Sequence, residues 1–383
     1  MLLHQPSDIR TINRLRVLNL IRSQKGLSRA DISKTLALNK PSCSEIVKEL
    51  IDEGLVAEGE KSQTESGRRP TPLMLAKGER LVVGISIGFR LLSIAISDLE
   101  GNVLGYKQIP TPHDPSPKEL CVLILKNFLH MYRGDGKKLA GCAIGVNARI
   151  SPDGSSIEEL SPWGWKDVPL ASPFATHMGC PCILVDETEA MVCAQRMLAK
   201  DNPDSFLYLN WGEVIGATLV LGKEEIKSNL GHVRVENEGS CTCGGTGCLE
   251  TVSAGWAIEK RFGETPLRTL SQQRPEGLGK VLEAATFALG MEIAQALAIT
   301  SQKRVLLGGT IPTLFPELGP KLTQAVDRFL PPFMGKAELI RSPLGDKARQ
   351  MGPVAVALER YVFRQSLLAA LGIEKNRYSL ERE

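Results

Sequence analysis

Apolar residues in the first 75 positions recur at helical spacing and then in two short runs typical of strands. Three helices and two strands are predicted, in the order 11–23, 28–36, 40–53, 55–58 and 73–75. Ser28 followed by Asp31 is a capping-box pattern that marks the start of the second helix. The order helix, helix, helix, strand, strand predicts a winged helix-turn-helix, whose third helix enters the major groove of DNA.

The outer face of the third predicted helix is polar, whereas Cys43, Ile46, Val47 and Leu50 are expected to point inward. The candidates for DNA contact are Lys40, Ser42, Ser44 and Lys48 on this helix and Arg68 and Arg69 at the predicted wing tip. The first 75 residues hold 12 Lys and Arg against 9 Asp and Glu, and the rest holds 34 of each. This excess favours a polyanionic partner. The alternative is a small helical oligomerisation domain with a charged hairpin, which would more often show an apolar stripe.

After residue 80 the pattern changes to alternating strands and helices. Strands, a helix and a further strand are predicted at 81–88, 91–98, 103–109, 117–132 and 140–146. The same order returns, with strands at 205–211, 217–221, 225–226 and 304–307. Two such halves predict an α/β fold with a duplicated ribonuclease H-like domain and a cleft between two lobes. The domains are predicted at 1–76 and 77–383, with lobes at roughly 77–190 and 191–360 and a C-terminal helix that packs back.

A compact set of metal ligands lies between residues 231 and 250. Its members are one nitrogen donor and three sulfur donors, His232, Cys241, Cys243 and Cys248. Three of the nine cysteines thus fall within eight residues, in a glycine-rich segment with little apolar bulk. A closed tetrahedral Cys3His site predicts structural zinc. The alternatives are a disulfide pair or buried thiols without a ligand.

Composition limits the class of protein and its location. Hydrophobic residues make up 43% and charged residues 23% of the 383 residues, as in ordinary globular proteins. We find no uninterrupted run of about 18 apolar residues and no signal-peptide pattern, so we expect neither a membrane span nor export. The six remaining cysteines are scattered, and reduced thiols in the cytoplasm are expected.

At this point the chain resembles the ROK family of bacterial repressors and sugar kinases over about residues 10–365. The matching segments are 84–90 (first phosphate loop), 160–170 (sugar-lobe segment), 181–190 (catalytic segment), 232–250 (zinc motif), 305–311 (adenosine-side glycines) and 345–355 (final helix). A winged helix ending in Gly67-Arg68-Arg69-Pro70 is similar to the regulators of this family. The resemblance implies a two-lobed sugar-kinase fold, a homodimer or homotetramer, and a sugar or sugar-phosphate effector.

The nucleotide side departs from the pattern of the family's kinases. Their first loop reads Asp-x-Gly-Gly-Thr, whereas this chain reads Ser86-Ile87-Gly88-Phe89-Arg90, without the carboxylate and with Phe89 for the second glycine. Their catalytic Asn-Asp corresponds to Asp186-Glu187, so the degenerate equivalent of the base is Glu187. Glu213 stands in the second phosphate loop, where it would repel a triphosphate. These departures predict that kinase activity is lost and that the chain is not an enzyme.

The resemblance also implies a polyol pocket. Its candidate residues are Asp186, Glu187, Asn229, His232 and Glu250. Asn229 stands where the family has a sugar-binding Glu, and Glu250 matches the other one. Alternatively, Asp186 and Glu187 are ordinary acids at a helix start.

The preferred interpretation is a cytoplasmic, sugar-responsive transcriptional repressor that binds operator DNA as a homo-oligomer. One alternative is an ATP-dependent sugar kinase with an attached DNA-binding domain. The other is a repressor controlled by a protein partner instead of a sugar.

Overall fold

The computed structural model describes residues 6–60, 71–134, 136–199, 203–222, 224–345 and 347–363. The chain forms two compact units. The first unit comprises Met1–Glu158, Lys166–Val185 and Pro353–Glu383, and the second unit comprises Glu159–Trp165 and Asp186–Gly352. The chain therefore crosses between the units four times, at Glu158/Glu159, Trp165/Lys166, Val185/Asp186 and Gly352/Pro353.

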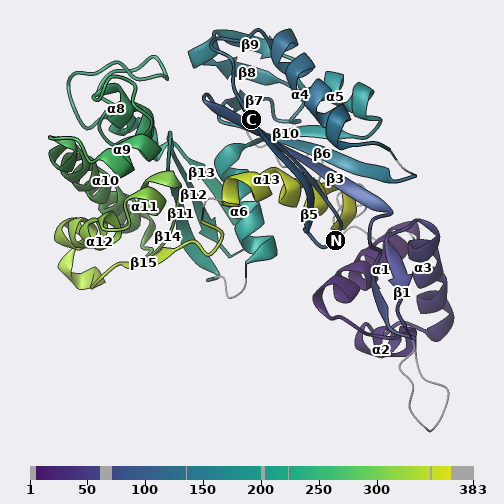
Figure 1. Ribbon diagram of the computed structural model, residues 1–383. Helices are drawn as coiled ribbons and strands as arrows, with labels where there is room; N and C mark the ends of the chain where they lie inside the picture. The colour runs from purple at the N-terminus through teal and green to yellow at the C-terminus, as the bar shows by residue number, and fades with distance from the viewer. Residues whose placement is uncertain are drawn as a thin grey trace, which may run out of the picture. The chain divides into compact units, whose positions relative to one another are not determined.

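The N-terminal part of the first unit is a winged helix-turn-helix (Figure 1). Its elements are α1 (Pro6–Ser23), α2 (Arg29–Thr35), α3 (Lys40–Asp52), β1 (Val56–Glu58) and β2 (Leu73–Leu75). The predicted capping box of Ser28 and Asp31 is confirmed, because each side chain accepts the other residue's backbone N–H. The predicted inward residues of the third helix are also confirmed, since Cys43, Ile46, Val47 and Leu50 are all buried.

The rest of the first unit is built on a five-stranded sheet in the order β10-β6-β3-β4-β5. Its strands are β3 (Arg80–Ile87), β4 (Leu91–Ser97), β5 (Val103–Pro110), β6 (Lys138–Val146) and β10 (Cys182–Asp186). Strands β3, β4 and β5 are antiparallel and β6 is parallel to β3. The remaining elements up to residue 178 are α4 (Pro117–Met131), β7 (Arg149–Ile150), β8 (Ile157–Leu160), η1 (Ser161–Trp163), β9 (Trp165–Val168) and α5 (Ala171–Met178). Of these, η1 and the adjoining ends of β8 and β9 fall in the second unit.

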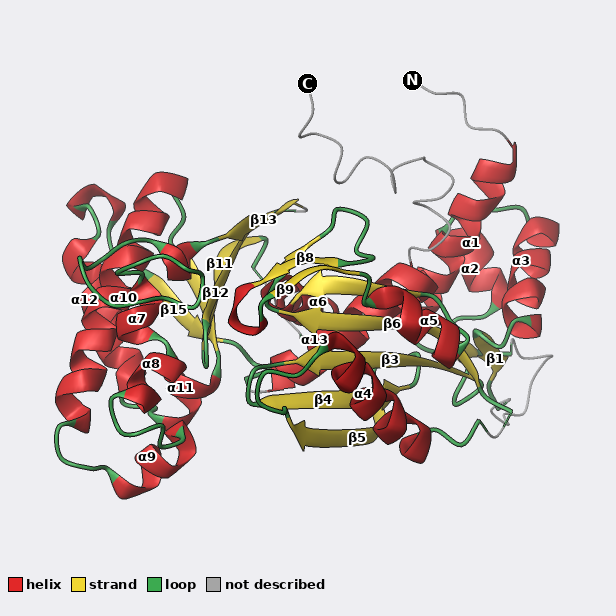
Figure 2. Cartoon of the chain, turned by 90° about the horizontal axis from the view of Figure 1, so that it is seen from above, coloured by secondary structure: helices red, strands yellow, loops and turns green. Residues whose placement is uncertain are grey.

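Helices cover both faces of this sheet: α4 and α5 lie on one face, and the second half of α13 (Lys347–Leu358), from Pro353 onward, lies on the other (Figures 1 and 2). Two glycines in the strands let α13 approach the backbone closely. A Cβ added to Gly84 would lie 2.6 Å from the backbone nitrogen of Val354, and one added to Gly145 would lie 3.0 Å from the ring of Pro353. The short π-helical turn η4 (Glu359–Phe363) continues α13.

The second unit repeats the strand order of the first, β15-β14-β11-β12-β13 against β10-β6-β3-β4-β5. Its strands are β11 (Ser205–Trp211), β12 (Ile215–Leu221), β13 (Glu224–Ser228), β14 (Arg304–Gly308) and β15 (Glu338–Arg341). In both sheets the first three strands are antiparallel neighbours in chain order. The fourth strand lies beside the first, and the fifth lies beyond the fourth at the edge. The prediction of a duplicated ribonuclease H-like domain is confirmed.

The helices of the second unit form two groups. The first group is α6 (Glu187–Leu198) with the start of α13, which pack on β11 through a small cluster that includes Met191, Tyr208 and Ala348. The second group lies on the opposite face and consists of η2 (Leu230–His232), α7 (Leu249–Ser253), α8 (Gly255–Lys260), α9 (Leu267–Gln273), α10 (Leu278–Thr300), α11 (Thr310–Leu314), α12 (Leu318–Phe329) and η3 (Pro332–Met334).

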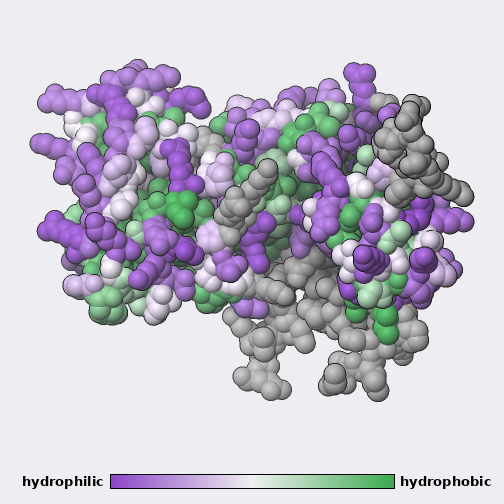
Figure 3. All heavy atoms as spheres, turned by 90° about the horizontal axis from the view of Figure 1, so that it is seen from below, coloured by the Kyte–Doolittle hydropathy of each residue, from purple (hydrophilic) through white to green (hydrophobic). Residues whose placement is uncertain are grey.

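Among the described residues one helix, α10, is long and apolar enough to cross a membrane by length and composition. Glu283 and Glu292 interrupt its apolar run. Leu282, Leu289 and Ile293 are buried in the main core of the second unit, as expected for a core helix. On the face of the molecule drawn in Figure 3, hydrophilic side chains predominate and hydrophobic ones gather in small areas.

Candidate functional site

The recognition helix of the winged helix-turn-helix presents a polar stripe. Lys40, Ser44 and Lys48 are spaced four residues apart, so they share one face of α3, and all three are exposed. Ser42 is half-buried, and its backbone N–H donates to the side chain of the N-cap residue Asn39 at 2.8 Å. Four of the six predicted DNA contacts thus lie on α3, whereas Arg68 and Arg69 lie outside the described residues.

Arginines of α1 pair with the glutamates of α3 and its C-cap. Arg10 lies 3.6 Å from Glu45 and also contacts Glu49. One guanidinium nitrogen of Arg14 donates to Glu53 at 2.6 Å. The pairs are exposed, so each contributes little to stability, but they offset negative charge on the helix that would face phosphates. Sequence reasoning missed them, although the spacing of four between the glutamates and between the arginines is a usable signal.

The predicted metal ligands lie together in the second unit. One donor atom from each of His232, Cys241, Cys243 and Cys248 lies within 4.8 Å of all the others. Cys241 Sγ is 3.7 Å from His232 Nδ1, and the sulfurs of Cys243 and Cys248 are also 3.7 Å apart. Ligands of a tetrahedral ion with bonds of about 2.0 to 2.3 Å lie roughly 3.5 to 3.8 Å apart, so the cluster has the size of a metal site. A disulfide needs about 2.05 Å between sulfurs, so the alternative of a disulfide pair is wrong for Cys243 and Cys248.

Glycines shape the loop that carries these ligands. Gly247 has a positive φ of 70°, and a Cβ there would lie 2.0 Å from the carbonyl oxygen of Glu236. A Cβ on Gly245 would lie 3.4 Å from the sulfur of Cys243 and 3.5 Å from that of Cys248. A side chain at Gly247 would therefore displace the loop, whereas a Cβ at Gly245 would be in ordinary van der Waals contact with the two sulfurs.

Burial disfavours the charged forms of three of the four predicted ligands. Burial raises the pKa of the Cys241 thiol to about 12, and burial also raises the pKa of Cys248. Partial enclosure of the His232 ring lowers its pKa, with a smaller contribution from Lys227, which favours the neutral imidazole that binds metals. A bound divalent cation would stabilise the thiolates that burial disfavours.

The two acids at the start of α6 are both paired with cations. Asp186 is the N-cap of α6, where one carboxylate oxygen accepts the N–H of Thr188 at 2.9 Å, and the other oxygen lies 2.7 Å from Lys227 Nζ. Buried Glu187 accepts a hydrogen bond of 2.6 Å from Arg349 Nε on α13. Asp186 thus occupies the helix-start role that the sequence left open as an alternative.

The other residues predicted for the polyol pocket, which we call the candidate effector residues together with Asp186 and Glu187, lie around the start of β12. They are Asn229, His232 and Glu250. Glu250 is buried, and its carboxylate accepts the N–H of Ile215 at 2.8 Å and the indole N–H of Trp256 at 3.3 Å. Burial raises the pKa of Glu250 to about 7, although the two donors oppose the shift. A Cβ on Gly231 would lie 3.1 Å from Glu250 Cγ, so this glutamate lies against the turn that carries Asn229 and His232.

Strand β12 also contacts α6, since a Cβ on Gly216 would lie 1.9 Å from Thr188 Oγ1. The start of β12 therefore lies between the first turn of α6 and Glu250. Sequence reasoning missed Lys227 and Arg349 as partners of the two acids. Arg349 is 162 residues from Glu187, and no local spacing could have paired them.

Comparison with protein families identifies both parts of the chain. The profile described as the ROK family matches residues 82–360. The chain belongs to the ROK family. A winged helix-turn-helix DNA-binding profile matches residues 10–57, which span α2, α3 and most of α1.

Curated relatives of this ROK protein include repressors from several bacteria. It is 27% identical over 261 residues to a putative xylose repressor of Caldicellulosiruptor sp. strain Rt8B.4, and the match covers 65% of either chain. It is 23% identical to the xylose repressor of Bacillus subtilis strain 168, over 92% of this chain and 97% of the relative. It is 21% identical to the DNA-binding transcriptional dual regulator NagC of Escherichia coli K12, over 89% and 91% of the two chains.

Solved structures share the fold of this ROK protein. A ROK family transcriptional regulator described as a homolog of the E. coli MLC protein matches with a TM-score of 0.76 at 22% identity, over 96% of this chain and 100% of that one. A ROK family glucokinase from Streptomyces griseus, in complex with glucose and AMPPNP, matches with a TM-score of 0.63 at 18% identity, over 73% of this chain and 99% of that one. The matches to regulator and kinase confirm the predicted fold class.

Proposed function

We propose that this ROK protein is a transcriptional repressor that binds operator DNA and responds to a sugar or sugar phosphate. The observation that carries the proposal is the winged helix-turn-helix, whose recognition helix exposes Lys40, Ser44 and Lys48 on one face. Short polar and cationic side chains on such a helix can reach base edges and phosphates. The xylose repressors and the regulator NagC, which match over most of their length or two thirds of it, support the same function.

The protein would act in the cytoplasm as a homodimer or homotetramer. A two-fold axis places two recognition helices on two half-sites of a pseudo-palindromic operator. Arg68 and Arg69, from the predicted wing, are proposed to contact phosphates or the minor groove, and Ser42 to contact bases beside Ser44.

Kinase activity is proposed to be lost. The carboxylate of Glu187, at the position of the family's catalytic base, is held by Arg349 at 2.6 Å, and a base must instead face the substrate hydroxyl. Ser86 takes the position of the first-loop Asp, which removes a ligand for Mg²⁺. A coupled assay with ATP and a panel of hexoses and pentoses tests this proposal: turnover above about 1 s⁻¹, within the usual enzyme range, would overturn it.

The metal cluster is proposed to hold structural zinc. Thiolate and imidazole donors suit Zn²⁺, and four protein ligands leave no position open for a substrate or water. The ion would fix the loop between Glu236 and Glu250, which leads directly into the helix of the candidate effector residue Glu250.

Operator binding is tested with fluorescent DNA from upstream of the protein's own gene. We expect an affinity in the range of about 10⁻⁸ to 10⁻¹¹ M that weakens as salt rises, measured by anisotropy. The same affinity for an unrelated duplex of equal length would contradict the proposal.

The effector is sought by thermal unfolding with D-xylose, D-glucose, N-acetyl-D-glucosamine and the 6-phosphates of the two hexoses. A ligand at 100 times its Kd adds about 2.7 kcal/mol to the free energy of unfolding, so the right sugar raises Tm. It must also change operator affinity, and a panel that changes neither would contradict sugar control.

Replacing Cys243 with Ser is expected to abolish stoichiometric zinc, because three ligands remain in a site built for four. Loss of the ion exposes the loop to local unfolding and lowers Tm by about 5 °C or more. Zinc is measured by inductively coupled plasma mass spectrometry and Tm by calorimetry. Cys182→Ser, outside the cluster, is the control and keeps zinc, whereas full zinc content in Cys243→Ser would contradict the assignment.

A further inference from the structure

The end of α1 and the turn that follows it contact the sheet-containing part of the first unit through three polar residues, Asn19, Arg22 and Lys25. Asn19 Nδ2 donates to the carbonyl oxygen of Phe363 at 3.1 Å. The guanidinium of Arg22 lies 4.4 Å from the centroid of the Phe363 ring and 4.0 Å from the carboxylate of Glu359. Both partners belong to η4. Cation–π and carbonyl contacts at a buried ring make this a defined docking position for the helix.

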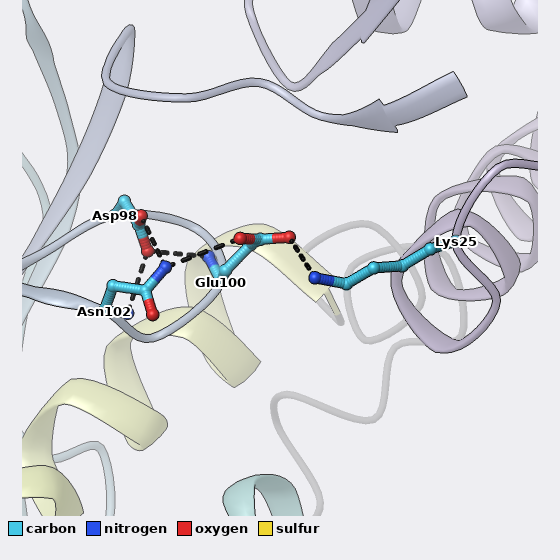
Figure 4. A network of polar contacts seen from close by, with 4 residues as sticks. All are labelled: Lys25, Asp98, Glu100 and Asn102. Carbon is cyan, nitrogen blue, oxygen red and sulfur yellow. Dashed lines mark hydrogen bonds and ion pairs between the residues drawn. The ribbon is translucent and has the colours of Figure 1, made fainter. Parts of the chain in front are cut away.

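The third contact comes from the turn between β4 and β5, which Figure 4 shows from close by. Lys25 Nζ lies 3.1 Å from Glu100 Oε1. Asp98 accepts the backbone N–H groups of Glu100 and Asn102 at 3.0 and 2.9 Å, and the Asn102 side chain donates to Asp98 at 2.9 Å and to Glu100 at 3.4 Å. This network orients the Glu100 side chain independently of Lys25, so less side-chain entropy is lost when the two residues pair. We call η4 and this turn the α1 seat.

The main part of the α1 seat is η4, which continues α13. Helix α13 begins beside Glu187, one of the candidate effector residues. Arg349, which holds Glu187, is in the first turn of α13, and η4 follows α13 without a break. Beyond Gly352, α13 packs on the backbone of the first sheet through Pro353 and Val354. One continuous stretch of 17 residues thus contacts Glu187 at one end and α1 at the other.

Helix α13 is weakened at Pro353, inside this stretch. Pro353 has no N–H, so it cannot donate the usual intrahelical hydrogen bond to the residue four positions before it. The chain passes from the second unit to the first at the same place, between Gly352 and Pro353. Because the helix is weakened there, side-chain contacts such as that between Arg349 and Glu187 matter more for holding its first half on α6.

We propose that α13 and η4 couple the candidate effector residues to the winged helix-turn-helix through the α1 seat. A ligand that engages Glu187 competes with Arg349, changes how the first half of α13 is held, and so changes the free energy with which η4 holds α1. The coupling is reciprocal, because a linkage free energy acts equally in both directions. Its regulatory meaning rests on the proposed function, but its test needs neither DNA nor sugar.

The test is amide hydrogen exchange of the full chain, read by mass spectrometry. Arg349→Gln removes the charge that holds Glu187, and residues 15–23 of α1 are expected to exchange roughly 2- to 30-fold faster than in the wild type. The matched control is Arg196→Gln, which breaks the 2.8 Å pair of Arg196 with Glu225, also in the second unit. This control leaves exchange in α1 unchanged.

The reverse experiment starts at the other end. Arg22→Gln is expected to speed exchange in residues 347–352, in the second unit. Arg16→Gln is its control, because Arg16 bonds Asn13 and the carbonyl of Leu36 inside the winged helix-turn-helix and does not contact the seat. A merely structural role of Arg22 would change exchange only in α1 and η4.

Should Arg349→Gln fail to fold, Glu187→Gln removes the same ion pair from the opposite side. The proposal is overturned if a folded variant changes exchange in the first half of α13 but leaves exchange in α1 as it is in the wild type. A chain that binds no operator could still show the coupling, and an operator-binding chain could lack it. Failure of the two proposals is therefore distinguishable.

Discussion

At the scale of single residues, three carboxylates of similar appearance in the sequence have different environments. Asp186 caps a helix and pairs with Lys227, Glu187 pairs with Arg349, and Glu250 accepts two N–H groups in a buried position. The sequence could nominate the acids but not their partners, since partners on β13 and α13 are joined only by folding. The metal ligands could be predicted as a group, because all four lie within a 17-residue segment.

Buried thiols of the first unit should resist alkylation. Burial raises the pKa of Cys121 to about 11 and that of Cys180 to about 12. A raised pKa leaves less thiolate at a given pH, so at pH 8 the reactive fraction of Cys121 falls by about a hundredfold from that of an ordinary thiol. Between pH 7.5 and 9.5 we expect iodoacetamide labelling of both residues to be slow and to rise with pH, as measured by peptide mass spectrometry. The urea-unfolded chain is the control, and equal rates in native and unfolded protein would contradict the prediction.

At the scale of elements, interior helices and strands could be predicted closely, because both the period and the caps were present. The third helix and strands β2 and β11 lie within one residue of the predicted bounds. Helix α1 begins at Pro6, five residues before the prediction, because its first turn has a proline at a position favourable for helix starts but little apolar periodicity. The docking of α13 could not be predicted, since it depends on glycines in strands that read only as apolar.

Substituting Gly84 tests this docking. In Gly84→Ala the new methyl would lie 2.6 Å from the backbone nitrogen of Val354, so α13 must shift. We expect a loss of about 1 to 3 kcal/mol in the free energy of unfolding, as for other overpacked sites. Gly279→Ala in α10 is the control, because open space surrounds that position, and it is expected to be neutral or stabilising by about 0.5 to 1 kcal/mol. Urea titration measures both, and equal stability would show that α13 does not pack so closely.

At the scale of the whole molecule, one chain joins a DNA-binding module to a duplicated sugar-kinase fold. Identical strand order in two sheets shows the duplication, and the family profile covers both. The repeated order of strands and helices made this architecture predictable. The contacts of Asn19 and Arg22 with η4 were not, because they join residues more than 330 positions apart.

Lys48 on the exposed face of α3 is expected to contact a phosphate. Lys48→Ala should weaken operator binding by about tenfold and reduce the slope of log affinity against log salt by about one, because one fewer counterion is released. Anisotropy titrations between 50 and 200 mM salt, roughly the range in which such slopes are read, measure both quantities. Lys280→Ala, on the exposed face of α10, is the control. An unchanged salt slope in Lys48→Ala would place the DNA elsewhere.

The arginines of α1 have a consequence for how the protein can be shortened or tagged. Glu45, Glu49 and Glu53 are neutralised from α1 by Arg10 and Arg14. A version that lacks residues 1–14 would keep every residue of α3. It would nevertheless present three uncompensated carboxylates to DNA. Electrostatic repulsion would then weaken DNA binding, and the defect would be easy to mistake for a damaged recognition helix.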